Sequence, residues 1–154
     1  MPSLLLTLCL ACCLLLSASP TLAIALDTDI VQTLSSRQMV RLLAEEGFAG
    51  ASIDRDDDII VKMHGYKVLV MVRGNDYRKV TYRFAVSGTS ANLKTVNEWN
   101  KKMAFTKAYL DNEGDPVLEM DVDLDGGVTV SRIRDSIKTF AQSLSVFLQQ
   151  LQEK

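Results

Sequence analysis

Two segments of the chain alternate between apolar and polar residues, which is the pattern of a strand that buries one face. In residues 79–86 one side carries Val, Tyr, Phe and Val, and the other side carries Lys, Thr, Arg and Ala. In residues 117–124 the apolar side alternates with three acids, Glu119, Asp121 and Asp123. Both segments therefore predict strands with one face on a core and one face toward solvent.

Four further strands are predicted where β-branched and aromatic residues lie between turn residues. They cover residues 48–53, 59–63, 66–73 and 105–110. The run Val68–Val72 shows little polar alternation, which is typical of a central strand that is covered on both faces.

Three helices are predicted from capping residues and helical spacing. Their expected limits are Ser35 or Ser36 to about Glu46, about Ala91 to Lys102, and Thr129 to about Gln150. In the last helix an apolar stripe repeats at spacings of three and four, through Val130, Ile133, Ile137, Phe140, Leu144, Phe147 and Leu151. We expect this stripe to cover the sheet, and a helix–helix dimer seam is the alternative.

The predicted order of elements, α-β-β-β-β-α-β-β-α, is that of an α+β layer fold built on an antiparallel sheet. A length of 154 residues and an apolar fraction of 47% fit one globular domain. We therefore expect residues 26–154 to form a single domain, preceded by a targeting segment.

The first 25 residues have the pattern of an export signal. Residues 4–16 are almost wholly apolar, yet this stretch is shorter than the ~20 residues of a membrane-spanning helix. A break at Pro20 is followed by small residues, so cleavage is expected after Ala23 or Ala25. The mature protein would then be periplasmic or secreted, with no stable membrane span.

Two alternatives remain for this segment. No Lys or Arg precedes Arg37, so the segment could stay uncleaved as a signal-anchor. Lipid attachment is the second alternative, because all three cysteines lie here, at positions 9, 12 and 13, although none follows a good lipoprotein box. Cleavage at the expected position leaves a mature chain without a thiol, which excludes disulfides, thiol catalysis and zinc-thiolate sites.

The net charge of −2 excludes a broadly cationic nucleic-acid binder, but the charges are separated along the chain. Residues 62–107 hold ten bases and two acids, a net +8, whereas residues 111–125 hold seven acids and no base, a net −7. The simplest explanation is that these strands lie side by side and neutralise one another. Complementary patches for self-association are the alternative.

The acidic segment includes the strand face formed by Glu119, Asp121 and Asp123. Together with the Asp–Gly pair that follows, it matches the first half of a calcium loop, but loop position twelve is Arg132 instead of a bidentate Glu. A strand also spreads carboxylates along a line instead of around an ion. A solvated sheet face is the first interpretation, and we keep these three acids as candidate residues for docking a basic partner.

The second helix carries the only Trp of the chain, in the polar-aromatic set Asn97, Trp99 and Asn100. The two asparagines are three residues apart and share a side of the helix. Because buried asparagines need hydrogen-bond partners, the first interpretation is that they tie the helix to the sheet backbone. A small-ligand pocket near Trp99 is the alternative.

The sequence offers little for catalysis. His64 is the only histidine, no G-x-S-x-G elbow surrounds a serine, and no glycine-rich phosphate loop is present. We therefore expect a protein that is not an enzyme and that uses no metal and no cofactor. A hydrolase built on Asp121 or Asp123 is the remaining enzymatic alternative.

The central part of the chain contains five distinctive blocks: N-E-W-N (97–100), A-F-T-K-A-Y-L (104–110), D-N-E-G-D (111–115), V-L-E-M-D-V-D-L (117–124) and G-G-V-T (126–129). These blocks resemble the YbjN domain family, whose members carry the label of bacterial sensory transduction regulators. The resemblance extends from about residue 35 to 148. It implies a fold like that of type III secretion chaperones, which are small, acidic, often dimeric proteins that bind segments of other proteins.

These observations together predict an exported, non-catalytic protein of bacterial type. It would bind a protein or peptide through its sheet face or an edge strand, as a monomer or a homodimer, and it would not bind nucleic acid. A link to sensory or stress regulation is implied by the resemblance alone. The alternative is an envelope sensor of small ligands.

Overall fold

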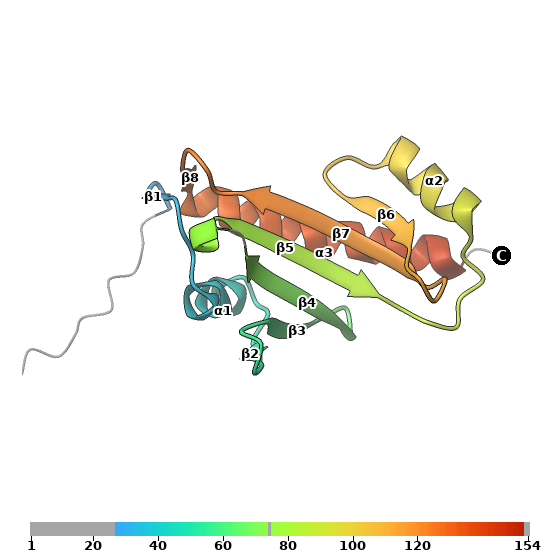
Figure 1. Ribbon diagram of the computed structural model, residues 1–154, viewed down its shortest axis with the longest axis horizontal. Coiled ribbons are helices and arrows are strands. Elements are labelled where there is room, and N and C mark those ends of the chain that lie inside the picture. Colours follow the sequence, from blue (N-terminus) through green and yellow to red (C-terminus); the bar gives the residue numbers. More distant parts are fainter. Residues whose placement is uncertain (1–26, 74, 153–154) are drawn as a thin grey trace, which may run out of the picture.

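A six-stranded antiparallel sheet carries the fold in the computed structural model, which describes residues 27–73 and 75–152 (Figure 1). The strand order is β2-β3-β4-β5-β7-β6, and a separate short pairing joins β1 to β8. In chain order the elements are β1 (Ile30–Val31), α1 (Ser36–Glu45), β2 (Ser52–Ile53), β3 (Ile59–Met63), β4 (Tyr66–Arg73), a 3-10 turn (Asn75–Tyr77), β5 (Lys79–Ala85), α2 (Leu93–Lys102), β6 (Lys107–Leu110), β7 (Pro116–Asp123), β8 (Val128–Thr129) and α3 (Val130–Gln152).

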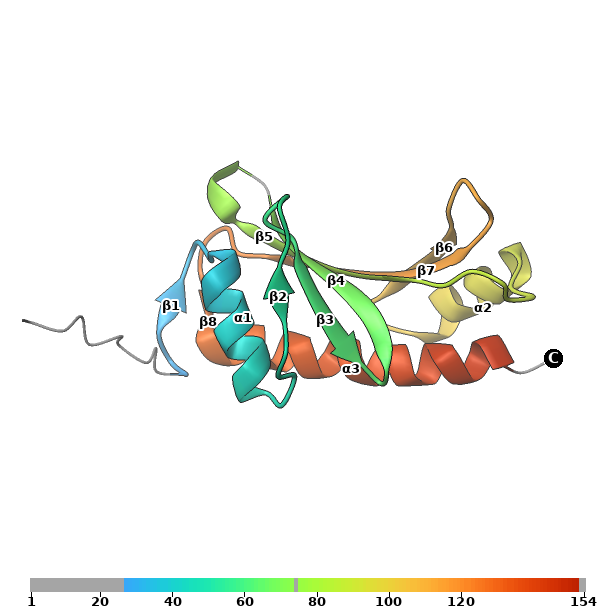
Figure 2. The ribbon, with the colours of Figure 1, turned by 90° about the horizontal axis from the view of Figure 1, so that it is seen from below.

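The three helices lie on one side of this sheet (Figure 2). The long helix α3 runs beneath the strands, α1 packs between α3 and β2, and α2 packs between α3 and β6. No helix of the described residues covers the opposite face of the sheet. The predicted α+β order is confirmed, with β1 and β8 added at the margins.

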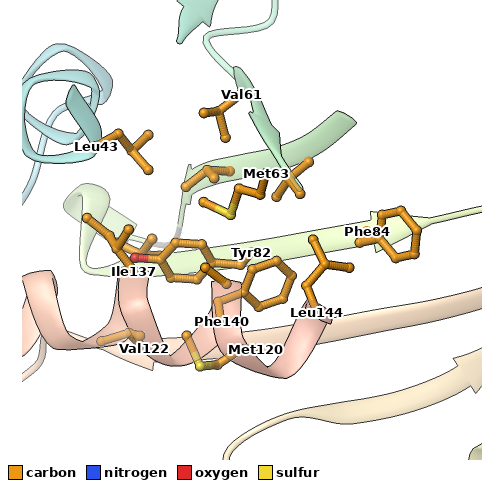
Figure 3. Close-up of a cluster of buried hydrophobic side chains, with 14 of the residues drawn as sticks. Leu43, Val61, Met63, Tyr82, Phe84, Met120, Val122, Ile137, Phe140 and Leu144 are labelled. Carbon is orange, nitrogen blue, oxygen red and sulfur yellow. The ribbon is translucent and has the colours of Figure 1, made fainter. Parts of the chain in front are cut away.

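The apolar stripe of α3 is buried against the sheet. Phe140 stacks on Tyr82 with ring centroids 5.2 Å apart, and Phe147 meets Trp99 edge-on at 5.0 Å. Tyr82 and Phe140 lie at the centre of the buried cluster, between Met63 and Met120 (Figure 3). The stripe therefore covers the sheet of its own chain, as predicted, and little of it is left for a dimer seam.

Two predicted strands begin later than expected. The segment predicted as a strand from residue 48 pairs only at Ser52–Ile53, because Phe48 donates its N–H to the Leu43 carbonyl at 2.8 Å and so closes the end of α1. The strand predicted from Phe105 begins at Lys107, because Phe105 has a positive φ of 69° that breaks an extended backbone.

The prediction that Val68–Val72 is covered on both faces was wrong. Val68, Val70 and Val72 are buried under the helices, but Leu69 and Met71 are only partly buried. The strand is central within the sheet, yet the described helices lie on one face of the sheet only. An apolar run can therefore mark a one-sided sheet whose outer face also carries apolar residues.

The second helix begins two residues later than predicted, at Leu93 instead of about Ala91. Asn92 is the N-cap, and its side-chain oxygen accepts the backbone N–H groups of Lys94 at 2.9 Å and Thr95 at 3.2 Å. Leu93, the first residue of the helix, is 74% exposed.

The expected signal segment and its cysteines lie outside the described residues. Within the described part of the chain, no helix is both long and apolar enough to cross a bilayer. The division of the chain near residue 25 stays a prediction.

Candidate functional site

The three acids Glu119, Asp121 and Asp123 lie on the face of β7 that points away from α3. The neighbouring strand β5 places Arg83 opposite Glu119, Thr81 opposite Asp121 and Lys79 opposite Asp123. On its other side, β7 pairs with β6, which places Lys107 opposite Glu119. Acidic and basic segments that are far apart in the sequence thus become adjacent strands.

Asp121 is held by three neighbours. It accepts a 2.5 Å hydrogen bond from Thr81 Oγ1, and its carboxylate lies 3.5 Å from Lys79 Nζ and 3.3 Å from Lys107 Nζ. Partial burial raises the pKa of Asp121, but the Thr81 hydrogen bond and the two lysines outweigh it, so the pKa lies below its usual value. Asp121 is therefore ionised and already paired at neutral pH.

Glu119 is the most enclosed of the three acids, with a side chain that is 14% exposed. Lys107 Nζ lies 2.7 Å from Oε1, and the Tyr109 hydroxyl donates to Oε2 at 2.9 Å. The hydrogen bond to Glu119 is the main cause of a raised pKa at Lys107. The expectation that the separated charges neutralise one another across strands is confirmed for Glu119 and Asp121.

Asp123 is different, because it makes no ion pair with the described residues. One of its oxygens accepts the backbone N–H of Asp125 at 2.9 Å, and the Asp125 carboxylate lies 3.0 Å from Arg78 Nη1. These acids follow a strand and its turn without converging on one point. In residues 27–73 and 75–152, no group of three or more His, Cys, Asp or Glu side chains is arranged to hold a metal ion.

The polar-aromatic set of α2 serves the packing of that helix on β6. Asn100 Nδ2 donates to the Ala108 carbonyl at 2.9 Å, and Ala108 N–H donates to Asn100 Oδ1 at 2.8 Å. Trp99, which is fully buried, donates its indole N–H to Thr106 Oγ1 at 3.2 Å. The interpretation that the two asparagines tie the helix to the sheet backbone holds for Asn100, whereas Asn97 is exposed.

A shallow hollow of about 600 Å³ does lie on the outer side of α2. It is lined by Leu93, Lys94, Val96, Asn97, Glu98, Asn100 and Lys101. The indole of Trp99 does not line it, because the ring points inward onto Phe147. A ligand in this hollow would contact Asn97, so the structure gives no support to a pocket built on Trp99.

The three acids are part of a larger uncovered face of the sheet, whose residues on β3 and β4 the sequence did not single out. We name it the open sheet face; its exposed or partly exposed residues on β3, β4, β5, β6 and β7 are Ile60, Lys62, Lys67, Leu69, Met71, Arg73, Lys79, Arg83, Ala85, Lys107, Tyr109, Glu119, Asp121 and Asp123. Thr81 and Val117 point to the same side but are buried. The signal was present in β4, where Lys67, Leu69, Met71 and Arg73 alternate with three buried valines.

Three solved structures have a similar fold. The YbjN protein of E. coli, described as a "putative transcription regulator", superposes with a TM-score of 0.55 at 15% identity, over 80% of this chain and 97% of its own. The Yersinia pestis type III secretion chaperone SycH was solved with a stable fragment of YscM2. It superposes with a TM-score of 0.51 at 10% identity, over 76% of this chain and 97% of its own. An uncharacterized protein from Methanothermobacter thermautotrophicus superposes with a TM-score of 0.53 at 17% identity, over 78% of this chain and 98% of its own.

These similarities confirm the predicted chaperone-like architecture. No curated protein matches the chain in sequence. The family model of YbjN, described as "Putative bacterial sensory transduction regulator", matches residues 35–153. The match begins at the N-cap of α1 and extends over α2, α3 and the whole six-stranded sheet. This chain therefore belongs to the YbjN family.

Proposed function

We propose that this protein is a non-catalytic binding domain that holds a segment of another protein on its open sheet face. The observation that carries the proposal is the one-sided covering of the sheet, with the helices on one face and none of the described helices on the other (Figure 2). In the middle of the uncovered face, Leu69 and Met71 remain partly exposed among charged residues. An apolar centre with a polar surround is typical of a protein interface.

The fold similarity supports this proposal. SycH was solved with a bound fragment of another protein, so a related architecture can hold a protein segment. The family description suggests a place in sensory regulation, and a regulator can act by binding a partner. Fold alone does not fix function, so the argument depends on the surface of this chain.

The geometry favours the face of the sheet over its β6 edge. An added strand would need free backbone groups along that edge. At Ala108 both the N–H and the carbonyl are already bonded to Asn100. The proposal therefore places the partner across the strands.

Site-specific photo-crosslinking in the cell tests this proposal. A photoreactive residue is placed at Leu69 or Met71 on the open sheet face, and the control position is Leu93, which is exposed on α2. We expect the first two positions to give an adduct with one reproducible second protein and Leu93 to give none. Equal labelling at all three positions, or adducts from Leu93 alone, would contradict the proposal.

We further propose that the domain works in the periplasm or outside the cell, after cleavage following Ala23 or Ala25. Among the described residues, contacts with the fold begin at Asp27: Ser131 N–H donates to the Asp27 carbonyl and Val130 N–H to the Asp29 carbonyl, both at 3.0 Å. Either cleavage site leaves these contacts in place. Intact mass and N-terminal sequencing of the protein from cell fractions test this, and an uncleaved chain in the membrane fraction would refute it.

A further inference from the structure

The register of the open sheet face brings like charges together. Lys62 on β3 lies directly opposite Lys67 on β4, and both side chains are exposed. Like charges in directly opposite positions destabilise an antiparallel pair. A sheet that only had to fold would gain from an acid at either position, so this pair suggests a role outside folding.

Arg83 extends this basic group onto β5. It lies opposite Leu69, which is two residues along β4 from Lys67. Arg83 also lies opposite Glu119, but that carboxylate is taken by Lys107 and Tyr109. Within the described chain, Lys62, Lys67 and Arg83 make no ion pair with any acid.

The rest of the open sheet face cannot neutralise this group. Its other three bases are Arg73, Lys79 and Lys107, and each of these has an acidic partner. Of the three acids on β7, only Asp123 makes no ion pair, and its register partner is Lys79 at the far end of β5 from Arg83. The surplus charge on this face is therefore positive and is concentrated around Leu69.

The basic group adjoins the apolar part of the face. Leu69 lies between Ile60 on β3 and Arg83 on β5, and Met71 follows it along β4. The surface thus offers apolar contact and unpaired positive charge within neighbouring register positions. A segment with alternating apolar and acidic side chains would match both.

We propose that the open sheet face binds a protein segment in which acidic side chains alternate with apolar ones. The acids meet Lys62, Lys67 and Arg83, and the apolar side chains rest on Leu69 and Met71. This inference rests on the proposed function and specifies the chemistry of the partner. It differs from the prediction from sequence, in which Glu119, Asp121 and Asp123 attract a basic partner, because Glu119 and Asp121 already have bases of their own.

The test uses three fluorescent peptides and the protein as purified from exporting cells. In the first peptide Glu alternates with Leu and Val, in the second Lys replaces Glu, and in the third Gln replaces Glu. Fluorescence anisotropy at low and high salt measures binding. We expect the acidic peptide to bind most tightly of the three. Its affinity should fall as the salt concentration rises, because salt screens exposed charges.

Two triple variants separate the basic group from net charge. The first variant combines Lys62→Gln, Lys67→Gln and Arg83→Gln. Its affinity for the acidic peptide should fall by about ten-fold or more. The control variant combines Arg37→Gln, Arg41→Gln and Lys94→Gln, which remove the same charge from the exposed surfaces of α1 and α2. Its affinity for the acidic peptide should stay within about two-fold of that of the wild type. Circular dichroism checks that both triple variants fold. The single substitution Lys67→Gln should raise the unfolding midpoint, because it relieves the repulsion between Lys62 and Lys67.

Four outcomes would overturn the inference. The first is that the first triple variant binds the acidic peptide as tightly as the wild type does. The second is that the basic peptide binds more tightly than the acidic one and that this binding is lost in the variant with Asp121→Asn and Asp123→Asn. The third is that a short DNA duplex competes with the acidic peptide as well as the unlabelled peptide does, and the fourth is that the protein self-associates and the first triple variant abolishes this self-association. If the peptides fail while crosslinking at Leu69 still captures a second protein, the partner chemistry is wrong and the proposed function stands. If the crosslinking also fails, the proposed function fails with it.

Discussion

The side-chain amide of Asn100 satisfies both backbone groups of Ala108, with Nδ2 to carbonyl and N–H to Oδ1 distances of 2.9 and 2.8 Å. Asn100 thus takes the place that a further strand would occupy beside β6. Exposed strand edges are sites of unwanted pairing, and a covering helix is one way to protect them. Helix α2 therefore both packs on the sheet and closes its edge.

Replacing Asn100 by Ala should lower the free energy of unfolding by about 1–3 kcal/mol, because Ala108 is almost fully buried and loses both partners. The same change at Asn97, which is exposed on the same helix, should stay within about 0.5 kcal/mol of the wild type. Urea unfolding measures both. Equal effects of the two substitutions would show that the amide pairing contributes little.

The environment of Trp99 predicts a fluorescence result. Its indole is fully buried against Phe147, so the native emission should be blue-shifted and resistant to acrylamide, and both properties should be lost in urea. A panel of small ligands should leave the native spectrum unchanged. A ligand that shifts the emission while the protein stays folded would restore the alternative of a small-ligand sensor.

Local patterns predicted those elements whose limits are set by neighbouring residues. The strands 59–63 and 66–73 were predicted to the residue, because His64 and Gly65 form a tight turn with positive φ between two β-rich runs. The short strand β1 was not predicted, because its partner β8 lies almost a hundred residues away in the chain.

The open sheet face required information that the sequence does not carry directly. β5 and β7 pair although α2 and β6 lie between them in the chain, so the partners of Asp121 could not be assigned from spacing. The opposition of Lys62 and Lys67 follows from the 64–65 turn and was in principle readable. What could not be read was the side on which α3 would lie, and hence which residues it would leave exposed.

Glu46 connects the end of α1 to α3 and gives a pH prediction. Its carboxylate lies 2.9 Å from Lys138 Nζ and 3.1 Å from Arg134 Nη1. The Lys138 hydrogen bond is the largest influence on the pKa of Glu46, and together with Arg134 it outweighs the opposing effect of burial, so the pKa lies below its ordinary value of 4.5. The unfolded chain then binds the proton more readily than the folded protein.

Stability from Glu46 should therefore be fully present above about pH 4.5 and be lost as the pH falls through the lower folded pKa. Glu46→Gln should lower the free energy of unfolding at pH 7 by about 1–2 kcal/mol and flatten its decline between neutral and acidic pH. Glu113→Gln, at an exposed turn position without an ion pair in the described structure, is the control. Parallel acid declines in wild type and Glu46→Gln would contradict this role.

Gly127 and Ile30 fix the start of the domain against the start of α3. Gly127 has a φ of +90°, and a Cβ there would lie 2.6 Å from Ile30 Cγ2, whereas Gly126, with a φ of +79°, has open space around it. Gly126→Ala should cost about 1–2 kcal/mol from backbone strain alone. Gly127→Ala should cost more, because it also displaces the side chain of Ile30 on β1.

A double-mutant cycle separates these two contributions. Ile30→Ala removes the clashing methyl group. The double variant with Gly127→Ala should therefore lose at least about 0.5 kcal/mol less free energy of unfolding than the sum of the two single losses. For Gly126→Ala with Ile30→Ala, the two losses should be additive. Urea unfolding of the six proteins gives these values. Additivity at Gly127 would mean that β1 moves aside without loss, and that the residues next to the expected cleavage site are not held by this contact.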